Sequence, residues 1–94
     1  MNIVLKKFGT VLTSRQAGRE ALAAFTPSLK TVGSDDLVVL DFSGVATLSP
    51  SWADEFITPL FAKYKKSLRM LPTDNSSVEA TLRILKLQLD AASA

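Results

Sequence analysis

The segment from Asp41 to Glu55 (DFSGVATLSPSWADE) holds the residues whose types and spacing best suit a functional site. It contains two serines at the expected start of a helix, and two capping schemes fit them. Ser49 is the N-cap if Pro50 takes the first helical position, where proline is favoured. Ser51 is the N-cap if Asp54, three residues later, completes a box-like arrangement. In either scheme a serine lies in the first helical turn, where free backbone N–H groups and the helix dipole favour an anion.

These two serines are the candidate phospho-acceptors of the chain. A phosphate on Ser51 adds a charge of about −1.5 to −2 at a position that tolerates it without loss of the fold. Ser49 is the second candidate. A plain capping role is sufficient to explain Ser51, since a serine cap contributes about 0.5–2 kcal/mol, and the two roles do not exclude each other.

The residues around these serines form a candidate surface for a protein partner or an anion, and each also has a structural interpretation. Asp41, at the end of the expected strand, either holds the following loop or binds a cation together with Asp54. Arg15, in the first turn of an earlier helix, needs an anion nearby. That anion is either one of these carboxylates, or Glu55, or a bound phosphate. Trp52 is either a core residue or an interface anchor. The candidate partner- or anion-binding residues are Arg15, Asp41, Gly44, Trp52, Asp54 and Glu55.

The composition excludes several kinds of chemistry. The 94 residues include no cysteine and no histidine, which removes thiol and imidazole catalysis, phosphohistidine, and metal sites built on either residue. We therefore predict no catalytic residue, no metal site and no cofactor, in a protein that is not an enzyme. A net charge of +2, with 11 basic and 9 acidic residues mixed along the chain, is too weak a bias to indicate nucleic acid.

Length and hydropathy predict a single cytoplasmic domain. No apolar stretch reaches the roughly 20 residues that a membrane span needs, and residues 1–8 do not have the pattern of a signal peptide. The absence of cysteine suits a reducing compartment. A chain of this length has one core, so we expect one domain over residues 1–94, with residues 91–94 frayed.

Strand-like and helical patterns alternate and predict the element order β-β-α-β-α-β-α. Residues 2–6 and 10–12 are expected to pair as a hairpin across Gly9. The alternation indicates an α/β fold with a mixed, mainly parallel, four-stranded sheet packed by three helices. Residues 37–42 (LVVLDF) are apolar on both faces, which predicts a central strand covered by helices on at least one face and, from this composition, on both. Ligands and partners of such sheets meet the carboxyl ends of the strands, here residues 41–44.

Proline and serine residues set the expected limits of the first two helices. The first opens at Ser14 and is ended or kinked by Pro27. The second follows a loop over residues 43–51 and is bent or shortened by Pro59. A short strand over residues 68–71 comes next.

The third helix is predicted from apolar residues at helical spacing over residues 78–89. Ser76 and Glu79 have the spacing of a capping box at its start. Ile84 and Leu87 widen its apolar sector, so a homodimer formed through this helix is one expectation.

The pattern from Leu40 to Leu60 resembles STAS domains, the fold of bacterial anti-sigma factor antagonists, and more closely the smaller group of STAS-like domains of unknown function. The likeness runs from about Ile3 to Leu85, and the expected element order agrees with that fold. It implies a STAS-like fold and a regulatory role. The residues that carry it are Phe8-Gly9, Leu12, Ser14-Arg15, Gly18, Leu40-Asp41-Phe42-Ser43-Gly44-Val45 and Leu48-Ser49-Pro50-Ser51-Trp52-Ala53-Asp54-Glu55-Phe56.

STAS antagonists commonly carry an Asp-Ser-Ser/Thr-Gly motif at the start of this helix, and an ATPase-type serine kinase phosphorylates one of its hydroxyls. Here the Asp of that motif falls on Ser49 and its first Ser on Pro50, while its second hydroxyl falls on Ser51 and its Gly on Trp52. Only Ser51 keeps the hydroxyl, so the resemblance supports the fold more strongly than the phosphorylation. It implies a protein partner, either such a kinase or an anti-sigma factor.

We therefore expect a regulatory protein-interaction module, with a docking surface between Gly44 and Glu55 that Ser51 switches. The alternative is a small-ligand or nucleotide sensor that uses the crevice at the strand ends. In that case Arg15 and the helix start would hold an anion.

Overall fold

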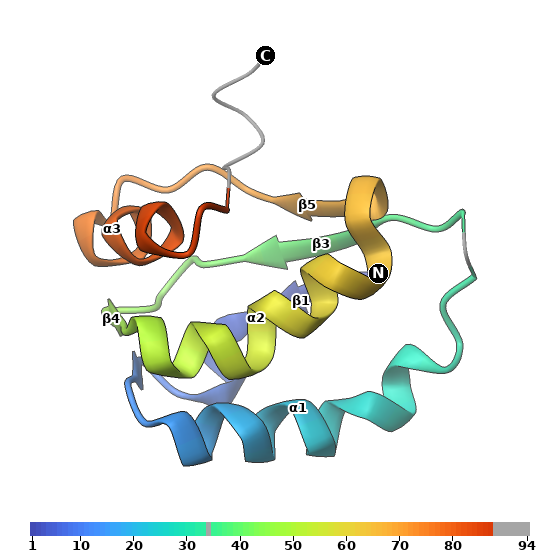
Figure 1. Cartoon of the computed structure of the whole chain (residues 1–94), viewed down its shortest axis with the longest axis horizontal. Coiled ribbons are helices and arrows are strands. Elements are labelled where there is room, and N and C mark those ends of the chain that lie inside the picture. Colours follow the sequence, from blue (N-terminus) through green and yellow to red (C-terminus); the bar gives the residue numbers. More distant parts are fainter. Residues whose placement is uncertain (34, 88–94) are drawn as a thin grey trace.

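Five short strands and three α-helices alternate along the part of the chain described by a computed structural model, residues 1–33 and 35–87 (Figure 1). With η marking a 3-10 helix, the elements are β1 (Asn2–Val4), η1 (Leu5–Phe8), β2 (Val11–Leu12), α1 (Arg15–Leu29), β3 (Val38–Asp41), β4 (Thr47–Leu48), α2 (Pro50–Tyr64), η2 (Lys65–Ser67), β5 (Leu68–Met70) and α3 (Ser76–Ile84). The predicted α/β alternation is confirmed, with β4 as an additional strand.

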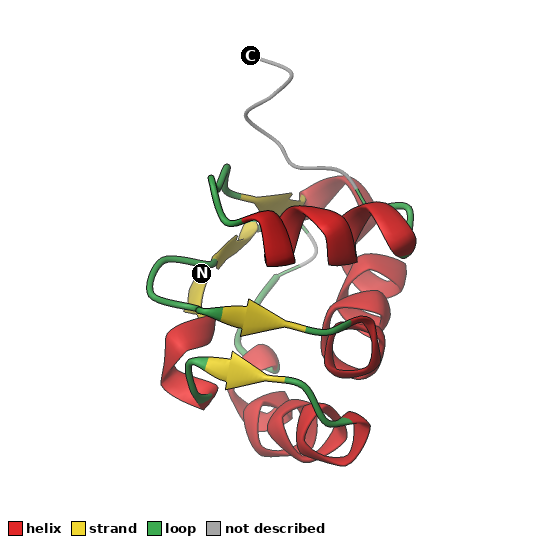
Figure 2. Ribbon diagram, turned by 90° about the vertical axis from the view of Figure 1, so that its left-hand side faces the viewer, coloured by secondary structure: helices red, strands yellow, loops and turns green. Residues whose placement is uncertain are grey.

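The strands form two parallel sheets in place of the predicted mixed sheet of four strands. β3 lies between β1 and β5 in one sheet, and β2 pairs with β4 in the other (Figure 2). The predicted hairpin between the first two strands is wrong. After β1 the chain passes through η1 and then turns at Gly9, where φ is 131°, so β2 emerges beside β4. A hairpin needs a tight turn between its strands, and η1 occupies that place.

β4 lies inside the segment predicted as a loop, because two residues are too few to show a strand periodicity. Hydroxyl groups of α3 form hydrogen bonds with the backbone of Leu48 in β4. The Leu48 N–H donates to Ser77 Oγ at 3.0 Å, and Thr81 Oγ1 donates to the Leu48 carbonyl at 2.6 Å. These contacts fix α3 beside the residues that open α2.

The core lies between the three-stranded sheet and the helices α1 and α2. The sheet residues that face these helices are Ile3, Val38, Leu40, Leu68 and Met70, all of which are buried. An aromatic cluster of Phe8, Phe25, Trp52 and Phe56 packs on the helix side. Apolar burial on this scale is the main source of stability in a small domain.

No α-helix of the described residues covers the opposite face of this sheet. In Figure 2, α1 and α2 lie together on one side of it. On the other side Val4 is 41% exposed and Leu37 is 49% exposed. The expectation that helices cover both faces of the central strand is therefore wrong for this part of the chain, and cover on one face is right.

The first two helices begin where their caps predict and continue past their prolines. Ser14 caps α1, because its Oγ accepts a hydrogen bond from the Ala17 N–H at 2.9 Å. Pro27 and Pro59 lie inside α1 and α2, and neither helix ends at its proline.

The start of α3 differs from its prediction. Asn75 is the N-cap, since its Oδ1 accepts a hydrogen bond from the Val78 N–H at 3.1 Å. The predicted capping box of Ser76 with Glu79 is therefore wrong, because Ser76 already lies within the helix. The predicted continuation of this helix beyond residue 84 is wrong for residues 85–87, because α3 ends at Ile84 and the chain turns so that Leu87 is buried. Residues 88–94, which include the end of the predicted helix and the predicted frayed end, lie outside the described residues.

Candidate functional site

Ser49 is the N-cap of α2, which decides between the two capping schemes. Its Oγ accepts a hydrogen bond from the Trp52 N–H at 3.2 Å and donates one to the Thr13 carbonyl at 2.7 Å. Pro50 takes the first helical position, as that scheme predicts. The scheme with Ser51 as the cap is wrong, because an N-cap precedes the helix and Ser51 lies within it. Ser49 thus ties the start of α2 to the loop before α1.

Ser51 lies in the same turn and has a different environment. It is partly exposed, and its hydroxyl has no hydrogen-bond partner among the described residues. Residues three and four positions further along a helix share its face, and here these are Asp54 and Glu55. Of the two candidate phospho-acceptors, Ser51 is therefore the one whose hydroxyl is unengaged.

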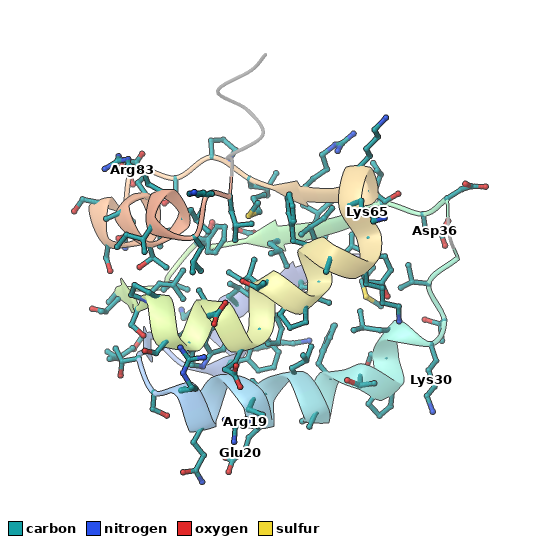
Figure 3. All side chains as sticks on the ribbon, viewed as in Figure 1. Arg19, Glu20, Lys30, Asp36, Lys65 and Arg83 are labelled. Carbon is teal, nitrogen blue, oxygen red and sulfur yellow. The ribbon has the colours of Figure 1, made fainter. Side chains whose placement is uncertain are left out.

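Ion pairs join the N-terminal halves of α1 and α2. Arg15 Nη1 donates to Asp54 Oδ2 at 3.1 Å and to Glu55 Oε2 at 3.0 Å. Arg19, labelled on α1 in Figure 3, donates from Nε to Glu55 Oε1 at 2.9 Å. The hydrogen bond to Asp54 is the main reason that the pKa of Arg15 is raised. The side chain of Arg15 is 48% exposed, so water screens these pairs and they stabilise the fold little.

Trp52 lies on the inner side of this helical turn. It is 1% exposed and stacks on Phe56 with 4.9 Å between ring centroids. Trp52 is therefore a core residue, and the interpretation as an exposed interface anchor is wrong. Helix α1 meets the Trp52 backbone at Gly18, where an added Cβ would lie 2.6 Å from the Trp52 carbonyl oxygen. This close approach is possible only because Gly18 has no side chain.

Asp41 and Gly44 are not part of the ion-pair cluster, and they shape the loop at the carboxyl end of β3. Asp41 Oδ1 accepts a hydrogen bond from the Ser43 N–H at 2.9 Å, and this bond lowers the pKa of the carboxyl group. Gly44 has a φ of 83°, which favours glycine. Asp41 thus holds the loop, as one interpretation predicts. No cluster of three or more potential metal-ligating acids occurs among the described residues, so the cation interpretation gains no support.

A crevice opens at the carboxyl ends of β3 and β5, where the sequence predicts that ligands or partners meet the sheet. It has a volume of about 490 Å³ and is lined by residues 42–45 and 72–75. Ser43 and Thr73 supply hydroxyl groups, and Asp74 is the only charged residue among the described residues that line it. A carboxylate repels phosphate, so the lining suits a neutral or cationic ligand better than a nucleotide.

Asn75 shapes this crevice and was missed as a site residue. Its Nδ2 donates to the Val45 carbonyl at 2.8 Å and to the Ala46 carbonyl at 3.1 Å, while its Oδ1 caps α3. An asparagine directly before a helical pattern is a recognisable N-cap signal. The sequence does not show which distant carbonyl groups the amide would reach.

Comparisons with protein-family models, with curated proteins and with solved structures gave no match. Fold and site define the class of the molecule as a parallel α/β protein with a polar, partly exposed helix start and a small crevice at its strand ends. Within the described ranges, no helix is both long enough and apolar enough to cross a membrane. The relationship to STAS-like domains stays a prediction.

Proposed function

We propose that this protein is a non-enzymatic regulatory module that docks a protein partner through the α2-start surface, defined as Arg15, Arg19, Ser51, Asp54 and Glu55. The observation that carries the proposal is the difference between its two serines. The Ser49 hydroxyl is engaged by two backbone groups, whereas the Ser51 hydroxyl is unengaged and partly exposed. Modification of Ser51 therefore leaves the helix cap in place.

A phosphate on Ser51 would act on this surface through its charge. It brings about −1.5 to −2 charge and three acceptor oxygens, one helical turn before Asp54 and Glu55. Arg15 and Arg19 already hold those carboxylates at 2.9 to 3.1 Å. The phosphate competes for the same guanidinium groups and repels the same carboxylates. The ion pairs between α1 and α2 would rearrange while the helix dipole favours the added charge.

The resemblance to anti-sigma factor antagonists supports an ATPase-type serine kinase or an anti-sigma factor as the partner. The largest change in side-chain size from the family motif is Trp52 in place of glycine. Because Trp52 is 1% exposed, that departure does not alter the surface that a kinase would contact. A partner that meets the α2-start surface would therefore read its charges and the state of Ser51.

Phosphorylation is tested by incubating the protein with ATP and an ATPase-type serine kinase from the same organism, and mapping the product by mass spectrometry. We expect phosphate on Ser51 in the wild type and in Ser49→Ala, and none in Ser51→Ala. Ser51→Asp should change partner affinity by about tenfold, which corresponds to 1.4 kcal/mol. The absence of modification over residues 49–51, together with unchanged partner binding by Ser51→Asp, overturns the proposal.

The crevice supports a second candidate function, a small-ligand sensor. Its 490 Å³ volume lies at the strand ends, where ligands of parallel sheets bind. A thermal-shift screen with amines, neutral polar metabolites and nucleotides tests this role. A ligand at one hundred times its Kd stabilises the fold by about 2.7 kcal/mol. We expect cationic or neutral compounds to raise the melting temperature, and Asp74→Asn to reduce the shift caused by the cationic compounds. A screen without any shift rules out this candidate.

A further inference from the structure

The first turn of α1 lies against the first turn of α2. Ser49 Oγ, at the cap of α2, donates to the Thr13 carbonyl just before α1 at 2.7 Å. Within the first turns themselves, a Cβ added to Gly18 would lie 2.6 Å from the Trp52 carbonyl oxygen. The residues between these two contacts are therefore held side by side. They are Arg15 to Ala17 in α1 and Pro50 and Ser51 in α2.

The guanidinium group of Arg15 lies over the helical turn that follows Ser51. Arg15 Nη1 bonds to Asp54 at 3.1 Å and to Glu55 at 3.0 Å. These carboxylates come three and four positions after Ser51, so they share its helix face, with Cβ atoms about 5–6 Å apart. Side chains on a helix tilt toward its N-terminus, so both carboxylates lean back toward Ser51. The guanidinium group that they hold is therefore within reach of a phosphate on Ser51.

Arg15 has hydrogen-bond donors that its ion pairs leave unused. A guanidinium group has five N–H donors, and Arg15 makes both of its ion pairs through Nη1. Its Nε and Nη2 atoms have no partner among the described residues. A phosphate group offers three acceptor oxygens, and arginine binds phosphate through two parallel hydrogen bonds. Arg15 can therefore bind a phosphate with donors that the fold does not require.

The two carboxylates that hold Arg15 are not held equally themselves. Glu55 accepts hydrogen bonds from both Arg15 and Arg19, through different oxygen atoms, and its side chain is 23% exposed. Asp54 accepts from Arg15 alone among the described residues, and its side chain is 40% exposed. A phosphate carries up to twice the charge of a carboxylate. In competition for Arg15, it should displace Asp54 before Glu55.

Arg19 is less suited to bind a phosphate at this position. It lies four residues, about 6 Å, further along α1 than Arg15, and its side chain is 67% exposed. Its Nε donates to Glu55 Oε1 at 2.9 Å, so its guanidinium group is held at the second turn of α2. Ser51 lies in the first turn. Of the two arginines on this surface, Arg15 is the one placed beside Ser51.

From these contacts we infer that Arg15 is the phosphate-binding residue of the α2-start surface. When Ser51 is phosphorylated, Arg15 exchanges Asp54 for the phosphate, while Glu55 stays bound to Arg19. This inference rests on the proposed phosphorylation of Ser51 and says what the phosphate does once it is present. The modification leaves α1 and α2 joined and releases the Asp54 carboxylate to solvent or to a partner.

Phosphoserine incorporated at position 51 during translation tests the inference without a kinase. A ³¹P NMR titration gives the second pKa of its phosphate, which is ordinarily about 6. The charged groups that face it are Arg15 and Arg19 from α1 and Asp54 and Glu55 from α2. A bound guanidinium group favours the dianion and lowers this pKa, so Arg15→Gln should raise it by about 1. Arg19→Gln is the matched control, because it removes the same charge one turn away, and should raise the pKa much less.

A second variant, Arg15→Lys, keeps the positive charge but not the planar pair of donors, and should raise the pKa less than Arg15→Gln does. Circular dichroism verifies that each variant is folded. The same pKa with and without Arg15 overturns the inference, and so do equal changes in Arg15→Gln and Arg19→Gln. If Arg15→Gln does not fold, an unchanged pKa in Arg15→Lys overturns it. Because translation supplies the phosphate, a negative result in the kinase experiment overturns the proposed phosphorylation and leaves this measurement unaffected.

Discussion

At the start of α2, the inner side, which faces the core, and the outer side, which faces solvent, differ in burial, packing and charge. On the inner side, Trp52 is buried against Phe56, and Gly18 of α1 meets its backbone. On the outer side, Ser51 is partly exposed beside carboxylates whose partners are the exposed arginines of α1. The inner side joins two helices through close packing, whereas the outer side joins them only through screened charges.

This difference separates residues that stabilise the fold from residues that can be substituted or modified without loss of stability. Ser49 and Ser51 are the same residue type two positions apart, yet among the described residues only the Ser49 hydroxyl has backbone partners. The inner side should therefore tolerate few substitutions, and the outer side many. Stability measurements on paired variants test this contrast directly.

The largest effect is expected from Trp52→Ala. Removing a buried indole leaves a cavity beside Phe56, which should cost about 3–5 kcal/mol of unfolding free energy. Asp54→Ala, on the exposed side of the same helix, should stay within about 0.5 kcal/mol. Chemical denaturation measures both. Similar losses for the two variants would mean that the two sides do not differ as described.

Gly18→Ala should have the next largest effect. Its Cβ would lie 2.6 Å from the Trp52 carbonyl oxygen, so α1 and α2 must move apart. Overpacking of this kind costs about 1–3 kcal/mol. Ala23→Leu, on an exposed position of α1, is the control and should stay within about 0.5 kcal/mol. Thermal unfolding of the two variants measures the difference. A Gly18→Ala variant as stable as Ala23→Leu would contradict the close contact between α1 and α2.

The two serines should respond differently to the same change. Ser49→Ala removes the N-cap of α2 and should cost about 0.5–2 kcal/mol. Ser51→Ala removes a hydroxyl without a partner among the described residues and should change stability by less than about 0.5 kcal/mol. Urea titrations of both variants provide the test. The reverse order would identify Ser51 as the cap and contradict the assignment of Ser49.

The smallest effect is expected at Asp41, an acid that resembles Ser49 in bonding to the backbone. Its pKa in the folded protein is lowered by the Ser43 N–H bond. The resulting stability is present above the ordinary carboxyl pKa of 3.8 and is lost as pH falls below it toward the folded value. Asp41→Asn should therefore show less acid destabilisation than the wild type between about pH 5 and pH 2. Identical pH profiles would show that this hydrogen bond contributes nothing.

Local patterns predicted much of the fold and part of the candidate site. The apolar spacing predicted all three helices and the strands β3 and β5, since these patterns depend only on which residues must be buried. Ser14 as a cap and Pro50 at the first position of α2 were also predictable, because caps depend on nearest neighbours in the chain. The carboxyl end of β3 was correctly expected to border a crevice.

The predictions that failed depended on contacts between distant segments. The hairpin was replaced by parallel pairs, because η1 carries the chain from β1 to a position beside β4. Trp52 could have faced the core or solvent, and its packing against Phe8 and Phe56, which are distant or set by the fold, decided this. The amide of Asn75 binds carbonyl groups that no local pattern reveals.

For this protein, the sequence alone determined that two serines stand at the start of a helix with carboxylates one turn later. It also determined that no histidine or cysteine is present to act with them. Only the tertiary structure decided which serine is structural. Neighbouring residues were enough to propose Ser49 as a cap. Its hydroxyl also donates a hydrogen bond to the Thr13 carbonyl in the loop before α1, which no local pattern reveals. Hydrogen bonds between distant segments form only after the chain has packed, so the state of each hydroxyl follows from the fold.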